Sequence, residues 1–281
     1  MTRWNLLTSA LALMGLVGSG CAGRHPDGSR SYPRVEFSLM QLAFPIGESR
    51  LTVRERQFGD GGLTLVNLHD DEQASVEAAV QVLERTGGRL IELVHSGKRR
   101  VEFSWQGKNY NFDPNRIFST AGVRLTVRGE EPIPQEVYLM VENFAQHFVE
   151  YFKLTHQRVL IALHNNDDAG SFSIHSYEPG ALYEADTERL HIEPAADPDD
   201  FCFVTDAKAF SELQRHQINV VLQDNRIRRD DGSLSVFSGR KGISYINVEA
   251  EPEHVDQQIR MVEIAMRILE DINRSKQRKR S

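Results

Sequence analysis

Short apolar runs that alternate with helix-like segments constrain the fold of this chain most strongly. The clearest run covers residues 158–163, and a helical pattern over residues 75–86 stops at Gly87 and Gly88. Strands separated by helices indicate an α/β protein with a mixed, mostly parallel sheet flanked by helices. The other predicted strands cover residues 63–68, 89–94, 200–204, 219–222 and 243–248.

A hairpin and two long helices complete the predicted elements. Residues 100–112 alternate between apolar and polar around a turn at residues 106–109, which indicates a hairpin. A helix follows Pro134, and another lies close to the C-terminus. Their apolar stripes are Val137, Met140, Val141, Phe144, Phe148 and Phe152 in the first and Ile259, Val262, Met266 and Leu269 in the second.

Length and charge limit the domain organisation and the partners. Residues 34–273 contain no linker long enough to divide them, so we expect a single domain there. The net charge of -7 argues against nucleic acid as a partner, because nucleic-acid binding usually needs a basic face. Residues 274–281 are basic, and we expect a disordered, solvated end rather than a binding arm.

The N-terminus is typical of a secretory signal. A charged start is followed by an apolar run over residues 6–17, which is too short to span a bilayer, and then by small residues up to Cys21. Residues 1–20 are therefore expected to be a signal peptide and residues 21–33 a flexible tether.

The small residues that end at Cys21 resemble the lipobox of bacterial lipoproteins, although Gly18 replaces the usual Leu. The resemblance implies cleavage before Cys21, lipid on its thiol and an anchor in the cell envelope, at the outer membrane facing the periplasm. Plain secretion with a free Cys21 is the alternative. Cys202 would then be the only other cysteine, and we expect it to be buried in a strand.

Chemically reactive residues follow three of the predicted strands. His69 and Glu72 lie past the first, His164 past another, and Glu249 at the end of a third. Sites in open α/β sheets form outside the carboxyl ends of strands, so these side chains could converge. Two imidazoles and one carboxylate are a ligand set for one catalytic Zn²⁺ that leaves a position for water. Hydrolysis also needs a carboxylate that moves the proton, and Glu249 is our candidate, with Glu251 as its rival on the same strand face.

The ordered set of motifs resembles the zinc carboxypeptidase superfamily, which includes the aspartoacylase and succinylglutamate desuccinylase deacylases. The motifs are the His-x-x-Glu of residues 69–72, the Asp-Pro-Asn-Arg-Ile-Phe of residues 113–118, Leu163-His164-Asn165 and Val248-Glu249. The resemblance implies a zinc-carboxypeptidase-like fold and hydrolysis of an amide bond in a peptide or an N-acyl amino acid. It also implies zinc on His69, Glu72 and His164, substrate contacts from Asn115 and Arg116, and Glu249 as the general base.

His164-Asn165 is closer in style to the deacylase branch. Two departures from the pattern prevent specificity from being carried over: Asp70-Asp71 replaces a Gly-rich pair, and Ile117 replaces a polar residue.

Several alternatives remain open at the level of sequence. Arg116 could bind a carboxylate or stabilise an oxyanion, and its alternative is a structural salt bridge. His175 is the likeliest further functional histidine, and residues 238–242 are interpreted as an ordinary turn. A location in the envelope would bring the enzyme to cell-wall peptides. The competing hypothesis is a catalytically inactive envelope binding protein that retains the fold.

Overall fold

The computed structural model describes residues 35–166, 172–226 and 229–278. The predicted signal peptide, Cys21 and the tether lie outside the described residues. No helix in these described ranges is long and apolar enough to cross a membrane.

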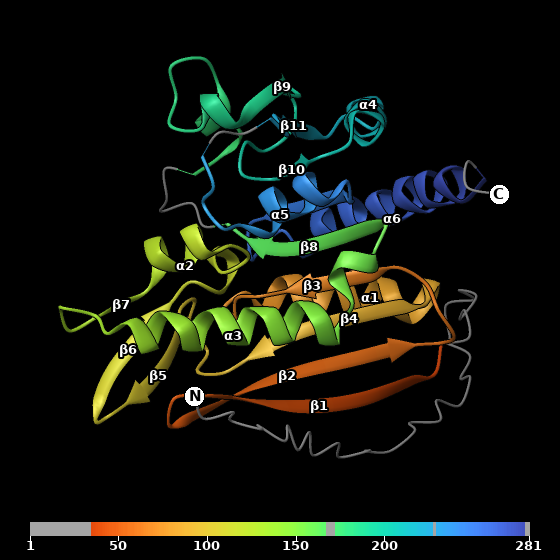
Figure 1. Cartoon of the computed structure of the whole chain (residues 1–281). Helices are drawn as coiled ribbons and strands as arrows, with labels where there is room; N and C mark the ends of the chain where they lie inside the picture. Colours follow the sequence, from red (N-terminus) through yellow and green to blue (C-terminus); the bar gives the residue numbers. More distant parts are fainter. Residues whose placement is uncertain (1–34, 167–171, 227–228, 279–281) are drawn as a thin grey trace.

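A nine-stranded sheet forms the centre of the described chain (Figure 1). Its strand order is β1-β2-β4-β3-β8-β12-β10-β11-β9, and a separate small sheet has the order β5-β6-β7. The strands of the large sheet are β1 (Phe37–Ile46), β2 (Ser49–Phe58), β3 (Thr64–Asn67), β4 (Gly88–Val94), β8 (Val159–Asn165), β9 (Thr187–His191), β10 (Phe201–Val204), β11 (Asn219–Gln223) and β12 (Ser244–Ala250). The small sheet contains β5 (Val101–Trp105), β6 (Lys108–Phe112) and β7 (Arg128–Gly129).

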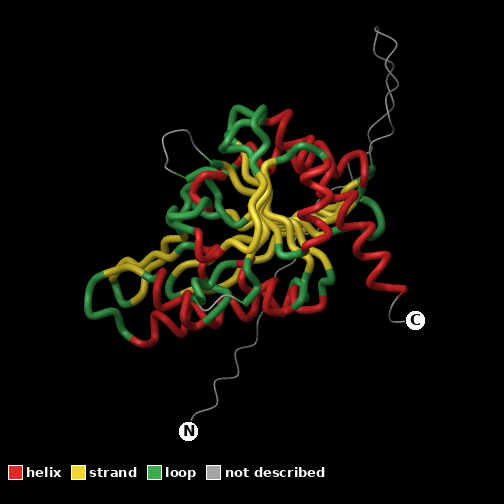
Figure 2. Tube along the Cα trace, turned by 90° about the horizontal axis from the view of Figure 1, so that it is seen from above, coloured by secondary structure: helices red, strands yellow, loops and turns green. Residues whose placement is uncertain are grey.

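Helices lie on both faces of the twisted large sheet (Figure 2). The helices α1, α4 and α6 contact one another or the strands on one face, whereas α2 and α3 pack together on the other. The α-helices are α1 (Gln73–Thr86), α2 (Thr120–Thr126), α3 (Gln135–Tyr151), α4 (Ala207–Arg215), α5 (Leu234–Lys241) and α6 (Val255–Arg278). Four short 3-10 helices are η1 (Pro114–Arg116), η2 (Leu154–His156), η3 (Ile174–Tyr177) and η4 (Glu184–Asp186).

The central strand β8 is buried on both faces, which explains its continuous apolar sequence. Leu160 and Ala162 join the core beneath α3, whereas Ile161 and Leu163 join the core beneath α1 and α6. All four side chains are inaccessible to solvent. Because successive side chains of a strand point to opposite faces of the sheet, this one apolar run contributes to both cores.

The predicted mixed α/β sheet with flanking helices is confirmed. The strands β4, β3, β8 and β12 run parallel to one another, so β3, β8 and β12 end at the same edge of the sheet. Fewer neighbouring strands are parallel than expected. The strand β10 is antiparallel to β12, and the outer strands β1, β2 and β9 are antiparallel to their neighbours. Cys202 is buried in β10, as predicted.

Two local predictions are wrong. Residues 238–241 are not a turn but the end of α5, which stops at Gly242 with a φ of 67° that favours glycine. Residues 274–278 are not disordered but continue α6. The ammonium of Lys276 donates to the carbonyl oxygens of Arg158 and Gly242, and this contact ties the helix end to the body of the protein. The hairpin of β1 and β2 and the helix α4 were not predicted.

Candidate metal centre

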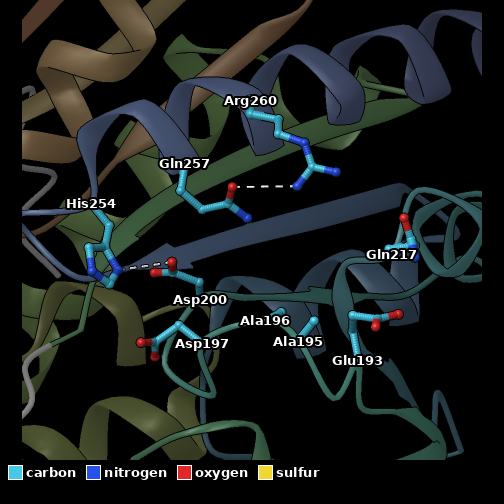
Figure 3. Close-up of a pocket in the computed structure, with 9 residues that line it drawn as sticks. All are labelled: Glu193, Ala195, Ala196, Asp197, Asp200, Gln217, His254, Gln257 and Arg260. Atoms are coloured by element: carbon cyan, nitrogen blue, oxygen red, sulfur yellow. Dashed lines mark hydrogen bonds and ion pairs between the residues drawn. The ribbon is translucent and has the colours of Figure 1, made fainter.

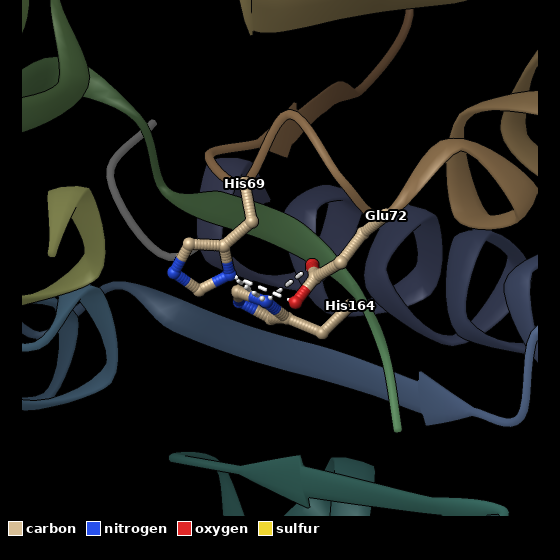
Figure 4. Close-up of side chains that lie close together, drawn as sticks. All are labelled: His69, Glu72 and His164. Atoms are coloured by element: carbon tan, nitrogen blue, oxygen red, sulfur yellow. Dashed lines mark hydrogen bonds and ion pairs between the residues drawn. The ribbon is translucent and has the colours of Figure 1, made fainter. Parts of the chain in front are cut away.

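His69, Glu72 and His164 meet at the carboxyl edge of β3 and β8, and their side chains point toward one another (Figure 4). The Nδ1 atom of His69 lies 2.9 Å from Oε1 of Glu72, and the Nδ1 atom of His164 lies 2.9 Å from Oε2. The two Nδ1 atoms are 3.1 Å apart. The predicted ligands therefore do converge, and they turn the same ring nitrogen toward one shared carboxylate.

Because these three side chains are buried, a charge on any of them is unfavourable unless a charge of opposite sign lies nearby. The three side chains are at most 5% exposed. Burial lowers the pKa of His69, but Glu72 and Asp113 outweigh it and raise the pKa to about 9. Burial raises the pKa of Glu72, yet His164 and His69 together hold it far below its usual value. A carboxylate this well buried needs compensating positive charge, which protonated imidazole or a metal cation supplies.

The donor set fits a metal ion of the zinc type. Ligand atoms around a tetrahedral zinc with bonds of about 2.0–2.1 Å lie about 3.3–3.4 Å apart. The observed separations of 2.9–3.1 Å therefore need to widen by only a few tenths of an ångström. Two imidazoles and a carboxylate also suit a divalent transition metal better than Mg²⁺ or Ca²⁺, which prefer oxygen ligands.

His69 is oriented through its second nitrogen by a carboxylate, as ligand histidines usually are. The Nε2 atom of His69 lies 2.9 Å from Oδ1 of Asp113, which also accepts a hydrogen bond from the backbone N–H of Asn115. The Nε2 atom of His164 lies 3.4 Å from the side-chain amide of Asn115. The contact with Asp113 leaves Nδ1 of His69 for the metal, whereas the amide nitrogen of Asn115 can only donate to Nε2 of His164.

Buried amides hold the backbone around the centre. Asn165 accepts a hydrogen bond from the N–H of Ser75 at the start of α1 and donates to the carbonyl oxygen of Ala250 and to Gln258. Gln258 in turn donates to the carbonyl oxygen of His164. The ends of β8 and β12 and the helices α1 and α6 are thus joined at the ligand residues, and Gln258 had no recognisable signal in the sequence.

The two carboxylates proposed as rival bases lie in different surroundings. Glu249 is paired with His164 in the register of β12 and β8, lines the same cavity as His164, and accepts a hydrogen bond from Asn247. Burial raises the pKa of its carboxyl group. Glu251 lies 3.5 Å from His254 instead. Only Glu249 is therefore placed to act on a substrate at the metal centre.

A cavity of about 240 Å³ opens beside the centre. Asn115 and Arg116, the predicted substrate residues, lie in its wall with His164 and Glu249. Arg116 makes an ion pair of 3.6 Å with Asp231, and both side chains remain about one-third exposed. Other lining residues used below are Arg99, Phe172, Tyr177, Tyr183, Asp186, Phe203, Arg229 and Tyr245.

Arg99 is a site residue that sequence analysis missed. Its guanidinium donates to Oε1 of Glu72 at 2.8 Å while the side chain remains half exposed. Asp70 accepts hydrogen bonds from the N–H groups of His95 and Gly97, at 2.7 Å each, and so closes the loop that carries Arg99. Asp70, which replaces a residue of the Gly-rich pair, thus has a structural role. The basic run Lys98-Arg99-Arg100 was the feature of the sequence that could have indicated Arg99.

A second group of metal-ligand types lies elsewhere, beside a cavity of about 430 Å³ (Figure 3). It contains Asp197, Glu251 and His254. The two ring nitrogens of His254 face different carboxylates, with Nδ1 3.0 Å from Asp200 and Nε2 3.5 Å from Glu251. Because both nitrogens of this imidazole already face carboxylates, the group is better explained as an ion pair than as a metal site. His175 does not reach either group, because it is half exposed and contacts Glu178.

No family model and no curated protein sequence matches the chain. Solved structures that align with most of this chain include a protein described as a metallopeptidase from Shewanella amazonensis, 13% identical over 82% of this chain and 85% of the other, with a TM-score of 0.36. Another is an aspartoacylase family protein from Mesorhizobium loti (16% identity, 82% and 67% coverage, TM-score 0.39). A third is an ectoine utilization protein from Ruegeria pomeroyi (13%, 84% and 65%, 0.40).

The structural overlap is loose, so the case for function rests on the chain's own residues.

Proposed function

We propose that this protein is a zinc-dependent hydrolase that cleaves an amide bond beside a free carboxylate, as a carboxypeptidase or an N-acyl amino acid deacylase. One observation carries the proposal. Three buried side chains of metal-ligand type, His69, Glu72 and His164, converge at a sheet edge. A fourth buried side chain, Glu249, lines the same cavity as His164.

The chain's own residues supply the remaining functions. A bound Zn²⁺ would act as a Lewis acid and make a water molecule more acidic. Glu249 is buried and has a raised pKa, so its carboxylate can take a proton from the attacking water and return it to the leaving amine. Arg116 offers a guanidinium for the substrate carboxylate, and Asn115 next to it fixes His164. Arg99 can stabilise negative charge that develops near Glu72.

The test uses two carboxylates that lie two residues apart at the end of β12. Zinc-loaded wild type, Glu249→Gln and the control Glu251→Gln are incubated with N-acyl amino acids, dipeptides and cell-wall peptides, and products are detected by mass. We expect hydrolysis by the wild type, a loss of about 100-fold or more for Glu249→Gln, and a small change for Glu251→Gln. Equal losses in both variants would contradict the assigned role of Glu249.

A wild type that binds zinc and these ligands but hydrolyses none of them would instead support the inactive binding protein. The location is a further part of the proposal. A lipid anchor at Cys21 would hold the enzyme in the cell envelope, where cell-wall peptides are accessible substrates. Incorporation of labelled fatty acid into the wild type, and its absence in Cys21→Ala, would support this location; an unlabelled wild type would contradict it.

A further inference from the structure

We propose that Asp231 is a specificity-determining residue that competes with the carboxylate of the substrate, and of the released product, for the guanidinium of Arg116. The inference rests on the proposed function and deepens it, because it names the group that a carboxylate ligand must displace. Asp231 belongs to none of the sequence motifs and lies in the connection between β11 and α5.

The guanidinium of Arg116 has one free edge for a carboxylate, and Asp231 faces that edge. The Nη1 atom donates to the carbonyl oxygen of Asn115 at 3.0 Å. The Nε atom, which forms a bidentate edge with Nη2, lies 3.6 Å from Oδ2 of Asp231. Both side chains line the cavity and remain about one-third exposed, so a ligand in the cavity can reach them. A carboxylate that binds this edge through two hydrogen bonds must therefore replace Asp231.

The ion pair is loose enough to be replaced. At a separation of 3.6 Å, Nε of Arg116 and Oδ2 of Asp231 attract each other but form no hydrogen bond. Charge-assisted hydrogen bonds between a guanidinium and a carboxylate are about 2.7–2.9 Å long, and two of them can form side by side. Ion pairs as exposed as this one also contribute little to stability. A bidentate substrate carboxylate therefore gains more from Arg116 than Asp231 loses.

The backbone that carries Asp231 is fixed against the segment of Arg116. The N–H of Phe118 donates to the carbonyl oxygen of Gly232 at 2.9 Å. Gly232 has a φ of 75°, and a Cβ atom there would lie 2.5 Å from the Cα atom of Gly122. The two segments thus approach each other too closely for a side chain at Gly232, and displacement of Asp231 requires a movement of its side chain rather than of the loop.

Asp186 provides a matched comparison within the same cavity. It carries the same charge and lines the cavity, but it forms no ion pair with any residue that the structure describes. Its electrostatic neighbours include both Arg229 and Arg116. Five aromatic residues share the wall and reduce the access of water to these charges: Phe172, Tyr177, Tyr183, Phe203 and Tyr245. Removal of either carboxylate makes the cavity less negative, but only removal of Asp231 frees an edge of Arg116.

The same competition applies to the product. Carboxypeptidases and deacylases both release an amino acid that keeps its α-carboxylate, so the product can occupy the same edge of Arg116. As the product leaves, Asp231 returns to Arg116 and replaces the interaction that is lost. Asp231 therefore weakens the binding of substrate and product alike, and the weaker product binding limits product inhibition.

The experiment measures the affinity for carboxylates and for matched neutral ligands. Zinc-loaded Glu249→Gln, in which hydrolysis is slow, is titrated calorimetrically with N-acetyl-L-alanine, N-acetyl-L-phenylalanine and the carboxamide of each. The titrations are repeated with Asp231→Asn added and, as the control, with Asp186→Asn added. Oδ1 of Asp231 accepts a hydrogen bond from the N–H of Ser233 at 2.9 Å, and the asparagine side chain keeps an oxygen for this contact.

We expect Asp231→Asn to bind the carboxylates about two- to fivefold more tightly, which is the range that exposed ion pairs represent. The affinity for the carboxamides should not change, and Asp186→Asn should tighten carboxylate binding less. With Glu249 intact, Asp231→Asn should lower KM and the inhibition constant of the released amino acid by a similar factor. The value of kcat should remain the same, because the contact with Arg116 is made equally in the bound substrate and in the transition state.

Three results would overturn the inference. The first is weaker or unchanged carboxylate binding by Asp231→Asn, which would show that Asp231 positions Arg116 or does nothing to it. The second is an equal gain for the carboxamides, and the third is an equal gain from Asp186→Asn.

Failure of the proposed function gives a different result. If the wild type cleaves no compound, the titrations still decide the inference, because they need binding and not hydrolysis. Tighter carboxylate binding by Asp231→Asn would then support the competition at Arg116 in a binding protein. If hydrolysis is observed but the substitution changes neither KM nor affinity, the inference fails and the proposed function stands. Binding of none of the four ligands would also overturn the inference.

Discussion

Among the residues that the structure describes, two groups bring three metal-ligand side chains together, and they differ in how their histidine nitrogens are directed. At the centre of His69, Glu72 and His164, two Nδ1 atoms face one carboxylate, and Asp113 accepts from Nε2 of His69. In the group around His254, both ring nitrogens of a single imidazole face carboxylates.

Side chains of the ligand types that lie within reach of one point therefore do not by themselves make a metal site. Both groups bring three ligand atoms within 4.8 Å of one another. Only the first directs two imidazole nitrogens to one point, with the second nitrogen of His69 held by Asp113. We therefore expect the first group to hold a metal and the second to act as a charge-paired link between β10, β12 and α6.

The largest expected effect is the loss of the metal when a ligand is removed. His164→Ala should weaken zinc binding by more than about 100-fold, because only two protein ligands remain. The matched change His254→Ala should leave one zinc per chain. Elemental analysis after dialysis against a chelator of known affinity measures the zinc content of both variants. Equal zinc loss in the two variants would contradict the assignment of the metal to the first group.

Metal binding should also stabilise the fold. Zinc at 100 times its dissociation constant adds about 2.7 kcal/mol to the free energy of unfolding. That corresponds to a rise in Tm of about 5–10 °C for a domain of this length. Calorimetric scans with zinc and with chelator measure the shift, which should be absent in His164→Ala and retained in His254→Ala.

A smaller effect is expected from the carboxylate behind His69. Asp113→Asn retains an oxygen that accepts from the N–H of Asn115 but removes the negative charge at Nε2 of His69. We expect zinc affinity to fall about 10–100-fold. Competition with a fluorescent chelator measures the change, with Asp197→Asn of the second group as the control that should bind zinc like the wild type.

The smallest effect is a pH-dependent contribution from His254. Burial lowers its pKa, but Asp200, Glu251 and Asp197 together raise it by more, so the folded pKa lies above that of the unfolded chain. The contribution to stability is then fully present below the unfolded pKa of about 6.5 and is lost as pH rises through the folded pKa.

His254→Gln should therefore cost roughly 0.5 kcal/mol at pH 6 and almost nothing at pH 9. Urea unfolding at both pH values measures the difference, and His147→Gln, at an exposed position of α3, is the control. A cost that increases toward pH 9 would show that His254 does not act as a cation.

The central fold was predictable because its signals are local. Strand β8 has an uninterrupted apolar sequence, and helix α1 ends at a glycine pair. The hairpin of β1 and β2 was not predicted, since it lies at a sheet edge where several side chains remain exposed and the apolar pattern is weak. The end of α6 was mispredicted because composition does not reveal the contact of Lys276 with Arg158 and Gly242.

The α/β class and the order of His69, Glu72, His164 and Glu249 follow from the sequence, because strand periodicity and motif spacing are properties of short segments. Only the tertiary structure decided that Glu249 and not Glu251 shares the cavity of His164, that Arg99 contacts Glu72, and that Asp186 lines the same cavity. These relations join residues far apart in the chain, and they depend on which strands pair and on where each loop turns back.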